Sequence, residues 1–331
     1  MRSHWTNPTI IRRPTIAVLS AAALLAACRD FPEATSPSRP QADVVVAPPL
    51  CLVVTSNTTL SGDCTGPLVV GASGITVNLG GHAVTCGPVP NPFLTFPFGI
   101  EITGQTNDHV TNGEVKNCYV GIEISLGGGH ELSNLNVHNH GFVGIDLKAS
   151  SNNDIRNTIS SDNSDTGVLL DADATFNKLD HLQIENGLVG IDILSGADNN
   201  VVTSSFLRDH VIGIWIVGSN NTIDQSTKVT QSGTGIDVVA STGNTIRATS
   251  SSENDSGIVL ETGATNTSIQ ASDASNNRLI GIWLLSGATS NRIMSNKALG
   301  NGSDLEDDNP DCDANTWKSN QFSSANQPCI S

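Results

Sequence analysis

Basic side chains are scarce in this sequence. The 331 residues include 16 Lys and Arg but 32 Asp and Glu, which gives a formal net charge of −16 at pH 7. A surface of this charge repels nucleic acid and anionic lipid, because both are densely negative. It also repels polyanionic glycans unless cations bridge the two surfaces. The composition therefore excludes nucleic acid as a partner.

Three further absences narrow the fold and the chemistry. No repeated segment has an apolar stripe at helical spacing, which excludes a helical solenoid. No Cys-x-x-Cys pair occurs, so a zinc or redox site of that type is not expected. Only two Met are present, one of them the initiator, so thioether ligands for copper are almost lacking.

The N-terminus has the pattern of a secretory signal. Residues 1–27 contain a basic region, an apolar run that is too short to span a bilayer as a stable anchor, and a small-residue end. Their end, Leu-Ala-Ala followed by Cys28, resembles the lipobox of bacterial lipoproteins. That resemblance implies cleavage before Cys28, a lipid anchor on its sulfur and, with Arg29 next, the outer membrane. Residues 28–49 are rich in Pro, Ser and Ala and predict a flexible tether.

Six cysteines remain after Cys28, an even number in an exported chain, which predicts disulfides. Their spacing suggests the pairs Cys51–Cys64, Cys86–Cys118 and Cys312–Cys329. Because a solenoid needs capped ends, we expect a disulfide-clipped N-terminal cap at residues 50–73 and a C-terminal cap at residues 306–331.

A motif of Gly-hydrophobic-x-hydrophobic recurs through residues 74–305. The interval is 21 to 25 residues, which indicates a solenoid. Each unit alternates β-branched residues and is punctuated by Asn, Gly and Ser, which predicts strands. The sequence therefore predicts an all-β protein, a parallel β-helix of about ten coils with three short strands per coil. The motif begins at Gly74, Gly99, Gly121, Gly144, Gly167, Gly190, Gly213, Gly235, Gly257 and Gly281, with a degraded copy at Gly302.

Most predicted coils carry an Asn just before the second strand. Stacked Asn amides can bond along the stack and satisfy turn backbone, so we interpret this row as structural. His130, His138 and His140 fall in one coil and could bind a transition metal, but His in place of Asn at ladder and turn positions is the favoured interpretation. The row comprises Asn153, Asn177, Asn200, Asn221, Asn244, Asn266 and Asn291.

The repeated frame, Gly-Ile-x-Leu followed by Asn-Asn-x-Ile, resembles the right-handed parallel β-helix repeats of the pectin-lyase-like superfamily, in the NosD-type version. The resemblance covers residues 74–305. It is strong evidence for the fold and weak evidence for the function. It implies that the sheet built from the first strand of each coil lines a substrate groove. We expect a monomer.

The position x of the motif points outward on the first strand and is dominated by acids. Two Trp interrupt them, three coils and so roughly 14 Å apart. Aromatic faces with interspersed acids suit sugar rings and hydroxyls, so a glycan groove is one interpretation; a solvated acidic column is the other. Coil by coil, x is Thr76, Glu101, Glu123, Asp146, Leu169, Asp192, Trp215, Asp237, Val259, Trp283 and Asp304.

Catalytic signatures of the superfamily are mostly missing. The polygalacturonase-type Asp clusters are not in frame, and the Asp-Pro-His motif of mannuronan epimerases is absent. One patch could be lyase-like, with carboxylates for Ca²⁺ and a lysine base. Its members are Asp146, Lys148, Asp171, Asp173 and Asp192.

The sequence favours an exported, lipid-anchored β-helix that binds polysaccharide along the first-strand groove. A polysaccharide lyase or glycoside hydrolase of the same superfamily, and a structural or adhesive solenoid, stay open as alternatives. No cofactor is expected, except Ca²⁺ if the lyase-like patch is used. The predicted ligand-binding residues are Trp215, Trp283, Glu101, Glu123, Asp146, Asp192 and Asp237.

Overall fold

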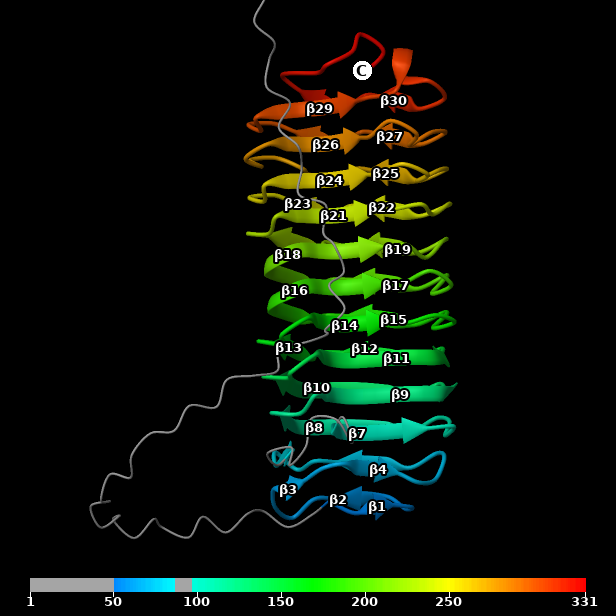
Figure 1. Ribbon diagram of the computed structural model, residues 1–331, viewed down its shortest axis with the longest axis vertical. Coiled ribbons are helices and arrows are strands. Elements are labelled where there is room, and N and C mark those ends of the chain that lie inside the picture. Colours follow the sequence, from blue (N-terminus) through cyan, green and yellow to red (C-terminus); the bar gives the residue numbers. More distant parts are fainter. Residues whose placement is uncertain (1–50, 87–96) are drawn as a thin grey trace, which may run out of the picture. The chain divides into compact units, whose positions relative to one another are not determined.

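The computed structural model describes residues 51–86 and 97–331, which form a stack of parallel β-coils (Figure 1). The predicted signal segment, Cys28 and the whole predicted tether lie outside these residues. Within the described part of the chain, no helix is long and apolar enough to cross a bilayer, the one short helix being η1 at Pro310–Cys312.

The first sheet contains one strand from every coil, stacked in sequence order from β1 to β29 (Figure 1). Twelve strands are stacked in this sheet, close to the roughly ten coils that the sequence predicts. Its strands are β1 (Val53–Val54), β4 (Leu68–Val70), β7 (Phe98–Thr103), β9 (Val120–Gly128), β11 (Val143–Ser151), β14 (Thr166–Leu170), residues 189–193 of β16 (Gln183–Ile193), residues 212–216 of β18 (Phe206–Ile216), β21 (Thr234–Val238), β24 (Ser256–Leu260), β26 (Ile280–Leu284) and β29 (Ser303–Asp307).

The second and third sheets complete each coil, so the predicted three strands per coil are confirmed. The second sheet consists of β2 (Thr58–Thr59), β5 (Thr76–Asn78), the first part of β8 (His109–Lys116), the first part of β10 (Glu131–His138), β12 (Asp154–Arg156), β15 (Lys178–Asp180), β17 (Val201–Thr203), β19 (Thr222–Asp224), β22 (Thr245–Arg247), β25 (Ser268–Gln270), β27 (Arg292–Met294) and β30 (Thr316–Lys318). The third consists of β3 (Cys64–Thr65), β6 (Ala83–Thr85), the second parts of β8 and β10, β13 (Ile159–Ser161), the first parts of β16 and β18, β20 (Lys228–Thr230), β23 (Ser250–Ser251), β28 (Lys297–Ala298) and β31 (Gln321–Phe322).

The core is a set of aliphatic ladders inside the coils. In the first sheet, Ile191, Ile214 and Ile236 lie in register on successive coils and are fully buried. In the second sheet, the predicted ladder is confirmed from Leu132 to Ile293 and ends on Trp317 in the last coil. Each rung buries apolar surface against the next rung about 4.8 Å away, which stabilises the stack.

The recurring Gly of the motif is required by space. A Cβ at Gly190 would lie 2.5 Å from the carbonyl oxygen of Gly213, and a Cβ at Gly213 would lie 2.6 Å from that of Gly235. Successive coils therefore approach too closely at this corner for any side chain. This close approach explains why the chain returns to Gly at every coil.

The Asn row forms a hydrogen-bonded ladder, as the sequence predicts. The backbone N–H of Asn200 donates to Oδ1 of Asn221, whose own N–H donates to Oδ1 of Asn244. Asn266 departs from the prediction: its φ is 51°, it lies on the surface, and Thr267 takes the buried ladder position and donates its N–H to Asn291. The one-residue shift arises because the turn places Asn266 in the left-handed region, where Asn is tolerated.

The register corrects the two ends of the predicted first-strand column. Thr76 pairs with His109 in the second sheet, and Val69 takes the place predicted for Thr76. At the other end, Leu305 lies opposite Ile282, so Glu306 faces outward next to Trp283. Asp304 is instead buried, and its carboxylate accepts hydrogen bonds from the N–H groups of Asn301, Ser323 and Ser324.

All three predicted disulfides are present: Cys51–Cys64, Cys86–Cys118 and Cys312–Cys329. The first lies in the N-terminal coil and the third in the C-terminal segment that follows β29. In that segment Trp317 is nearly buried, and its Nε1 donates to Oδ2 of Asp307 at 2.9 Å. These contacts cover the last coil, which would otherwise expose its apolar interior.

Candidate functional site

One column of side chains runs along the outer surface of the first sheet, and we call it the outward column. Its members alternate along each strand with fully buried aliphatic residues, so they point away from the interior. It contains all seven residues predicted to bind a ligand. In register the column is Val69, Glu101, Glu123, Asp146, Leu169, Asp192, Trp215, Asp237, Val259, Trp283 and Glu306.

Three carboxylates occupy consecutive rungs near one end of the column. Glu101 accepts a hydrogen bond from the hydroxyl of Thr103, at 3.3 Å. Burial raises the pKa of Asp146 to about 6, and Lys148 opposes this shift while Glu123 adds to it. Burial also raises the pKa of Glu123. At neutral pH this cluster therefore holds carboxyl groups that take up a proton more readily than carboxylates in water.

Asp192, Trp215 and Asp237 occupy three consecutive rungs in the middle of the column. Asp192 lies between Leu169 and Trp215, and is 8% exposed; Asp237, on the other side of Trp215, is 7% exposed. Burial is the largest cause that raises the pKa of each Asp to about 7. Both carboxyl groups therefore titrate near neutral pH.

This central part of the column contains polar atoms without partners. Oδ1 of Asp192, Nε1 of Trp215 and Oδ1 of Asp237 are all buried and have no hydrogen-bond partner among the described residues. A buried polar atom without a partner is costly and is rare in folded proteins. Two acceptors and one donor on adjacent rungs are therefore unsatisfied within the fold.

The second predicted tryptophan, Trp283, differs from the first. Its Nε1 donates to Oδ2 of Asp308 at 3.0 Å, and Asp308 follows directly after β29. Sequence reasoning placed Asp308 in the cap and missed this contact, because no repeat position marks it. The three-coil interval between Trp215 and Trp283 is confirmed by the register through Asp237 and Val259.

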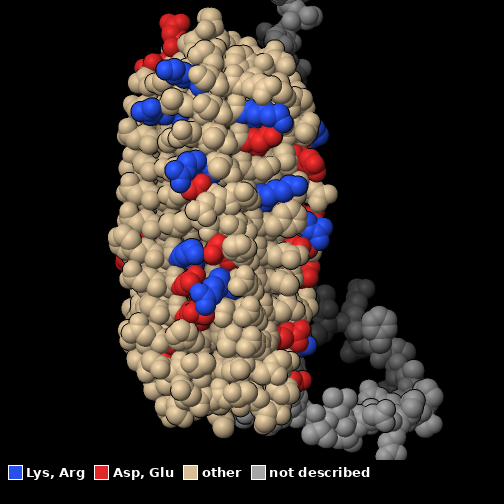
Figure 2. All heavy atoms as spheres, turned by 180° about the vertical axis from the view of Figure 1, so that it is seen from behind, with Lys and Arg blue, Asp and Glu red and all other residues tan. Residues whose placement is uncertain are grey.

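Carboxylates on the other two sheets pair with basic side chains. Asp224 accepts hydrogen bonds from Nε and Nη2 of Arg247, the first at 3.3 Å, and Glu185 pairs with Arg208 at 2.5 Å. Figure 2, which shows the opposite side of the molecule, has Lys and Arg lying beside Asp and Glu. The unpaired acids of the outward column are therefore not a general feature of this acidic chain.

The lyase-like patch and the histidines do not form a metal site among the described residues, where no group of three or more His, Cys, Asp or Glu could hold an ion. Lys148 lies 4.0 Å from Asp171, as a half-exposed ion pair. His130 is an Asn substitute in the ladder: its Nδ1 accepts the N–H of Asp108, and its own N–H donates to Asn153. His140 bonds in the same way between Cys118 and Asn163, so the structural interpretation of both is confirmed.

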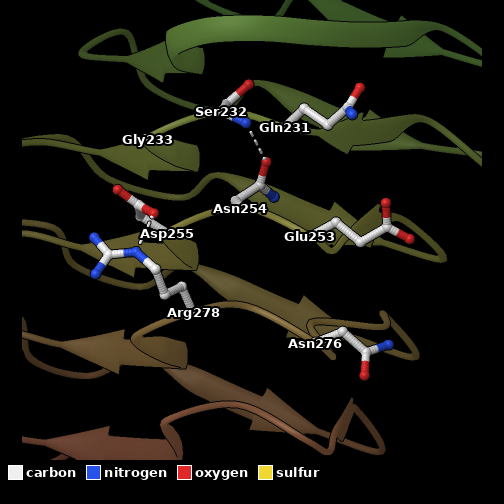
Figure 3. A pocket seen from close by; sticks show the side chains of 8 residues that line it. All are labelled: Gln231, Ser232, Gly233, Glu253, Asn254, Asp255, Asn276 and Arg278. Atoms are coloured by element: carbon white, nitrogen blue, oxygen red, sulfur yellow. Dashed lines mark hydrogen bonds and ion pairs between the residues drawn. The ribbon is translucent and has the colours of Figure 1, made fainter.

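A shallow hollow of about 500 Å³ lies away from the column, at turns that follow third-sheet strands (Figure 3). Its walls include Glu253, Asp255 and Arg278. Arg278 donates to Asp255 at 2.7 Å, and both side chains are largely exposed. The hollow is therefore lined by turn residues, and none of them has a buried side-chain atom without a partner.

Two family models match the chain. Residues 53–207 match the right handed beta helix region, and residues 175–327 match NosD, described as a periplasmic copper-binding protein. Together these matches span residues 53–327, and with the parallel coils and their register they show a right-handed parallel β-helix, the fold of the superfamily that the repeats resemble. A comparison with curated proteins gave no match.

Solved structures with the same fold include enzymes that act on polysaccharides. The A-module of the Azotobacter vinelandii mannuronan C-5 epimerase AlgE4 has a TM-score of 0.66 at 13% identity, over 83% of this chain and 88% of that chain. An alginate lyase from Paenibacillus sp. has a TM-score of 0.52 at 16% identity, over 66% and 88%. The pectate lyase Pel9A has a TM-score of 0.53 at 14% identity, over 79% and 71%. At these identities the likeness shows the fold alone.

Proposed function

We propose that this protein is an exported polysaccharide-binding protein whose glycan lies along the outward column of the first sheet. The observation that carries this proposal is the trio Asp192, Trp215 and Asp237, with an indole between two carboxyl groups and a buried polar atom without a partner on each. Sugar rings pack on aromatic faces, and their hydroxyls both donate and accept hydrogen bonds. A glycan bound here would contact the indole and the two carboxyl groups beside it.

The length of the column fits an oligosaccharide. Trp215 and Trp283 lie three rungs apart, which corresponds to roughly 14 Å at the spacing of β-strands. A pyranose unit in a chain advances by about one rung, so several units would contact the column together. Structural relatives that act on alginate or pectate support a carbohydrate ligand, without naming one for this chain.

Export and anchoring are part of the same proposal. Three disulfides require an oxidising compartment, and the NosD family model is described as periplasmic. We propose a periplasmic or extracellular location, with a lipid on Cys28 and residues 28–49 as a tether between the membrane and the β-helix. Labelling of wild type but not of Cys28→Ser by a radioactive fatty acid in the producing cell tests the anchor.

The binding proposal is tested by measuring the affinity of the full chain for a panel of neutral, acidic and amino polysaccharides. For the ligand found, Trp215→Ala is expected to weaken binding by about 10- to 100-fold, the effect of losing an aromatic contact of 1–3 kcal/mol. Phe176→Ala is the matched control, because Phe176 is 60% exposed but lies on a turn away from the column. Equal effects of the two variants would contradict the proposal.

A second candidate function, a glycoside hydrolase or lyase, is favoured by Glu123 and Asp146. These carboxyl groups lie on adjacent rungs, and the pKa of Asp146 is raised to about 6, chiefly by burial. A protonated carboxylic acid beside a second carboxylate is the arrangement that glycoside hydrolysis uses. Shortening of a polysaccharide by wild type, lost in Asp146→Asn and retained in Phe176→Ala, would establish this activity. Binding without shortening would leave polysaccharide binding as the function.

A further inference from the structure

The charge around the central trio is of one sign. Besides burial, the groups that raise the pKa of Asp192 are Asp165 and Asp171, and the group that raises that of Asp237 is Glu261. All three neighbours are acidic. The effect of Lys148 is on Glu123 and Asp146, further along the column. A uronate or sulfated sugar would therefore meet repulsion at this point of the column.

The trio also has the geometry of a cation site. Trp215 lies in register between Asp192 and Asp237, which are two rungs and so about 9.6 Å apart along the column. A cation over the indole face gains from the ring quadrupole, and it is attracted by the carboxylate on either side. A buried carboxyl group needs such a partner to ionise without a large desolvation cost.

Neutral sugars would satisfy the hydrogen bonds but not the charge. A hydroxyl can bond to the carboxyl group of either Asp, yet it supplies no positive charge to offset the ionised form of that group. An ammonium group on the sugar supplies both a hydrogen-bond donor and the charge. A neutral sugar and an amino sugar therefore differ in one group, the amine at a ring carbon.

We propose that Asp192, Trp215 and Asp237 form a subsite for an amino sugar with a free, protonated amine, so that the ligand is a polysaccharide containing unacetylated hexosamine. This inference rests on the proposed function and narrows it to a cationic class of glycan. The sugar ring packs on Trp215, and its ammonium group pairs with the carboxylate of one of the two Asp. Ionisation of the Asp carboxyl groups then accompanies binding.

The test is calorimetric titration of the full chain at pH 6.5 with a glucosamine hexamer, an N-acetylglucosamine hexamer and a galacturonate hexamer. The glucosamine hexamer is expected to bind at least about 10-fold more tightly than the other two, because only it pairs with the carboxylates. Titrations in two buffers of different ionisation enthalpy are expected to show net proton release, because a bound cation lowers the pKa of Asp192 and Asp237.

Variants separate this subsite from general attraction to an acidic protein. Asp192→Asn/Asp237→Asn is expected to remove the preference for the free amine and the proton release, and Asn keeps the shape of the side chain. Asp224→Asn is the matched control, because it removes the same charge from a carboxylate paired with Arg247. A lysine hexamer serves as a cation without a sugar ring and is expected to bind more weakly than the glucosamine hexamer, because it has no ring to pack on Trp215.

Each other outcome has a defined meaning. Equal or tighter binding of the acetylated or uronate hexamer through Trp215 would overturn the amino-sugar subsite and leave the proposed polysaccharide function intact. Preference for the free amine that survives in the double Asn variant, or that the lysine hexamer matches, would overturn it as general electrostatic attraction. Absence of binding by every glycan of the panel would overturn the proposed function itself.

Discussion

Acidic side chains on the first sheet and on the other two sheets are in opposite environments. On the second sheet, the pKa of Asp224 is lowered, first of all by its hydrogen bond to Arg247. On the first sheet, burial raises the pKa of Asp237 to about 7, with only Glu261 adding to the effect. The comparison shows that acidic side chains on this fold can pair with basic ones. The outward column of the first sheet differs, because its acidic side chains have no basic partner.

The effect of the acidic side chains on the stability of the fold also differs between the unpaired and the paired face. A carboxyl group with a raised pKa favours the folded state only while it is protonated, so it makes the fold less stable as pH rises. A carboxylate with a lowered pKa has the opposite effect and makes the fold less stable as pH falls. A surface that serves only solubility needs exposed acids, not buried ones without partners. The column therefore keeps a destabilising feature that ligand binding would relieve.

The largest expected effect is on the unpaired face. The pKa of Asp237 rises from 3.8 in the unfolded chain to about 7 in the fold. At about 1.4 kcal/mol per pKa unit, this corresponds to at most about 4 kcal/mol. Because the folded state holds the proton more tightly, stability falls as pH rises from about 4 to about 7, and then stays low. Asp237→Asn is expected to be more stable than wild type at pH 8.5 by this order, and equal to it at pH 3.5.

Urea unfolding followed by circular dichroism at the two pH values measures this difference. Asp192→Asn serves as a second variant, because the same cause raises its pKa to about 7. A decrease in stability at pH 8.5 in both variants would show that the carboxylates are satisfied in the fold, and the contrast between the two faces would fail.

A smaller and opposite effect is expected on the paired face. Asp224→Asn removes the ion pair with Arg247 and should cost about 0.5–1 kcal/mol at pH 7, the usual range for pairs at a protein surface. Because the folded pKa of Asp224 is lowered, its contribution is present above pH 4 and is lost as pH falls through the folded pKa. The same urea series gives this value, and a stability loss that persists at pH 2 would contradict the ion-pair account.

The smallest expected effect is that of salt. Raising the ionic strength from 0.05 to 0.5 M shortens the screening length from roughly 14 Å to about 4 Å, which weakens exposed ion pairs. The effect of Asp224→Asn on the free energy of unfolding should therefore shrink by a few tenths of a kcal/mol. The effect of Asp237→Asn at pH 8.5 should stay nearly constant, because it arises from burial. Equal salt dependence of the two would remove the distinction between the faces.

Much of the fold is predictable from local spacing. The Gly interval gives the coil, the alternation gives the strands, and the even set of cysteines gives the three disulfides that the structure contains. These features can be read because each coil repeats the same short-range pattern. Errors arose at the two ends of the repeat. The motif at Gly74 is intact but its strand lies in the second sheet, and the degraded copy at Gly302 misplaces the outward position by two residues, on Asp304 instead of Glu306.

The candidate site is only partly predictable. The seven side chains of the column follow from alternation on the first strand, and the structure brings all of them into register. Asp308 was missed as a partner of Trp283, because the cap has no repeat position from which to infer contacts. Burial of Asp192 and Asp237 was missed because an outward position is expected to be solvated.

The sequence by itself determined the coil length, the three-strand coil, the inward ladders and the order of residues along the outward column. These depend on residues close together in the chain and on one repeating geometry. Only the tertiary structure decided which carboxyl groups have a basic partner and which are buried without one. The reason is that the solvation of a carboxyl group and the charges around it depend on side chains one coil away. Register and packing decide which side chains those are, and spacing along the chain does not.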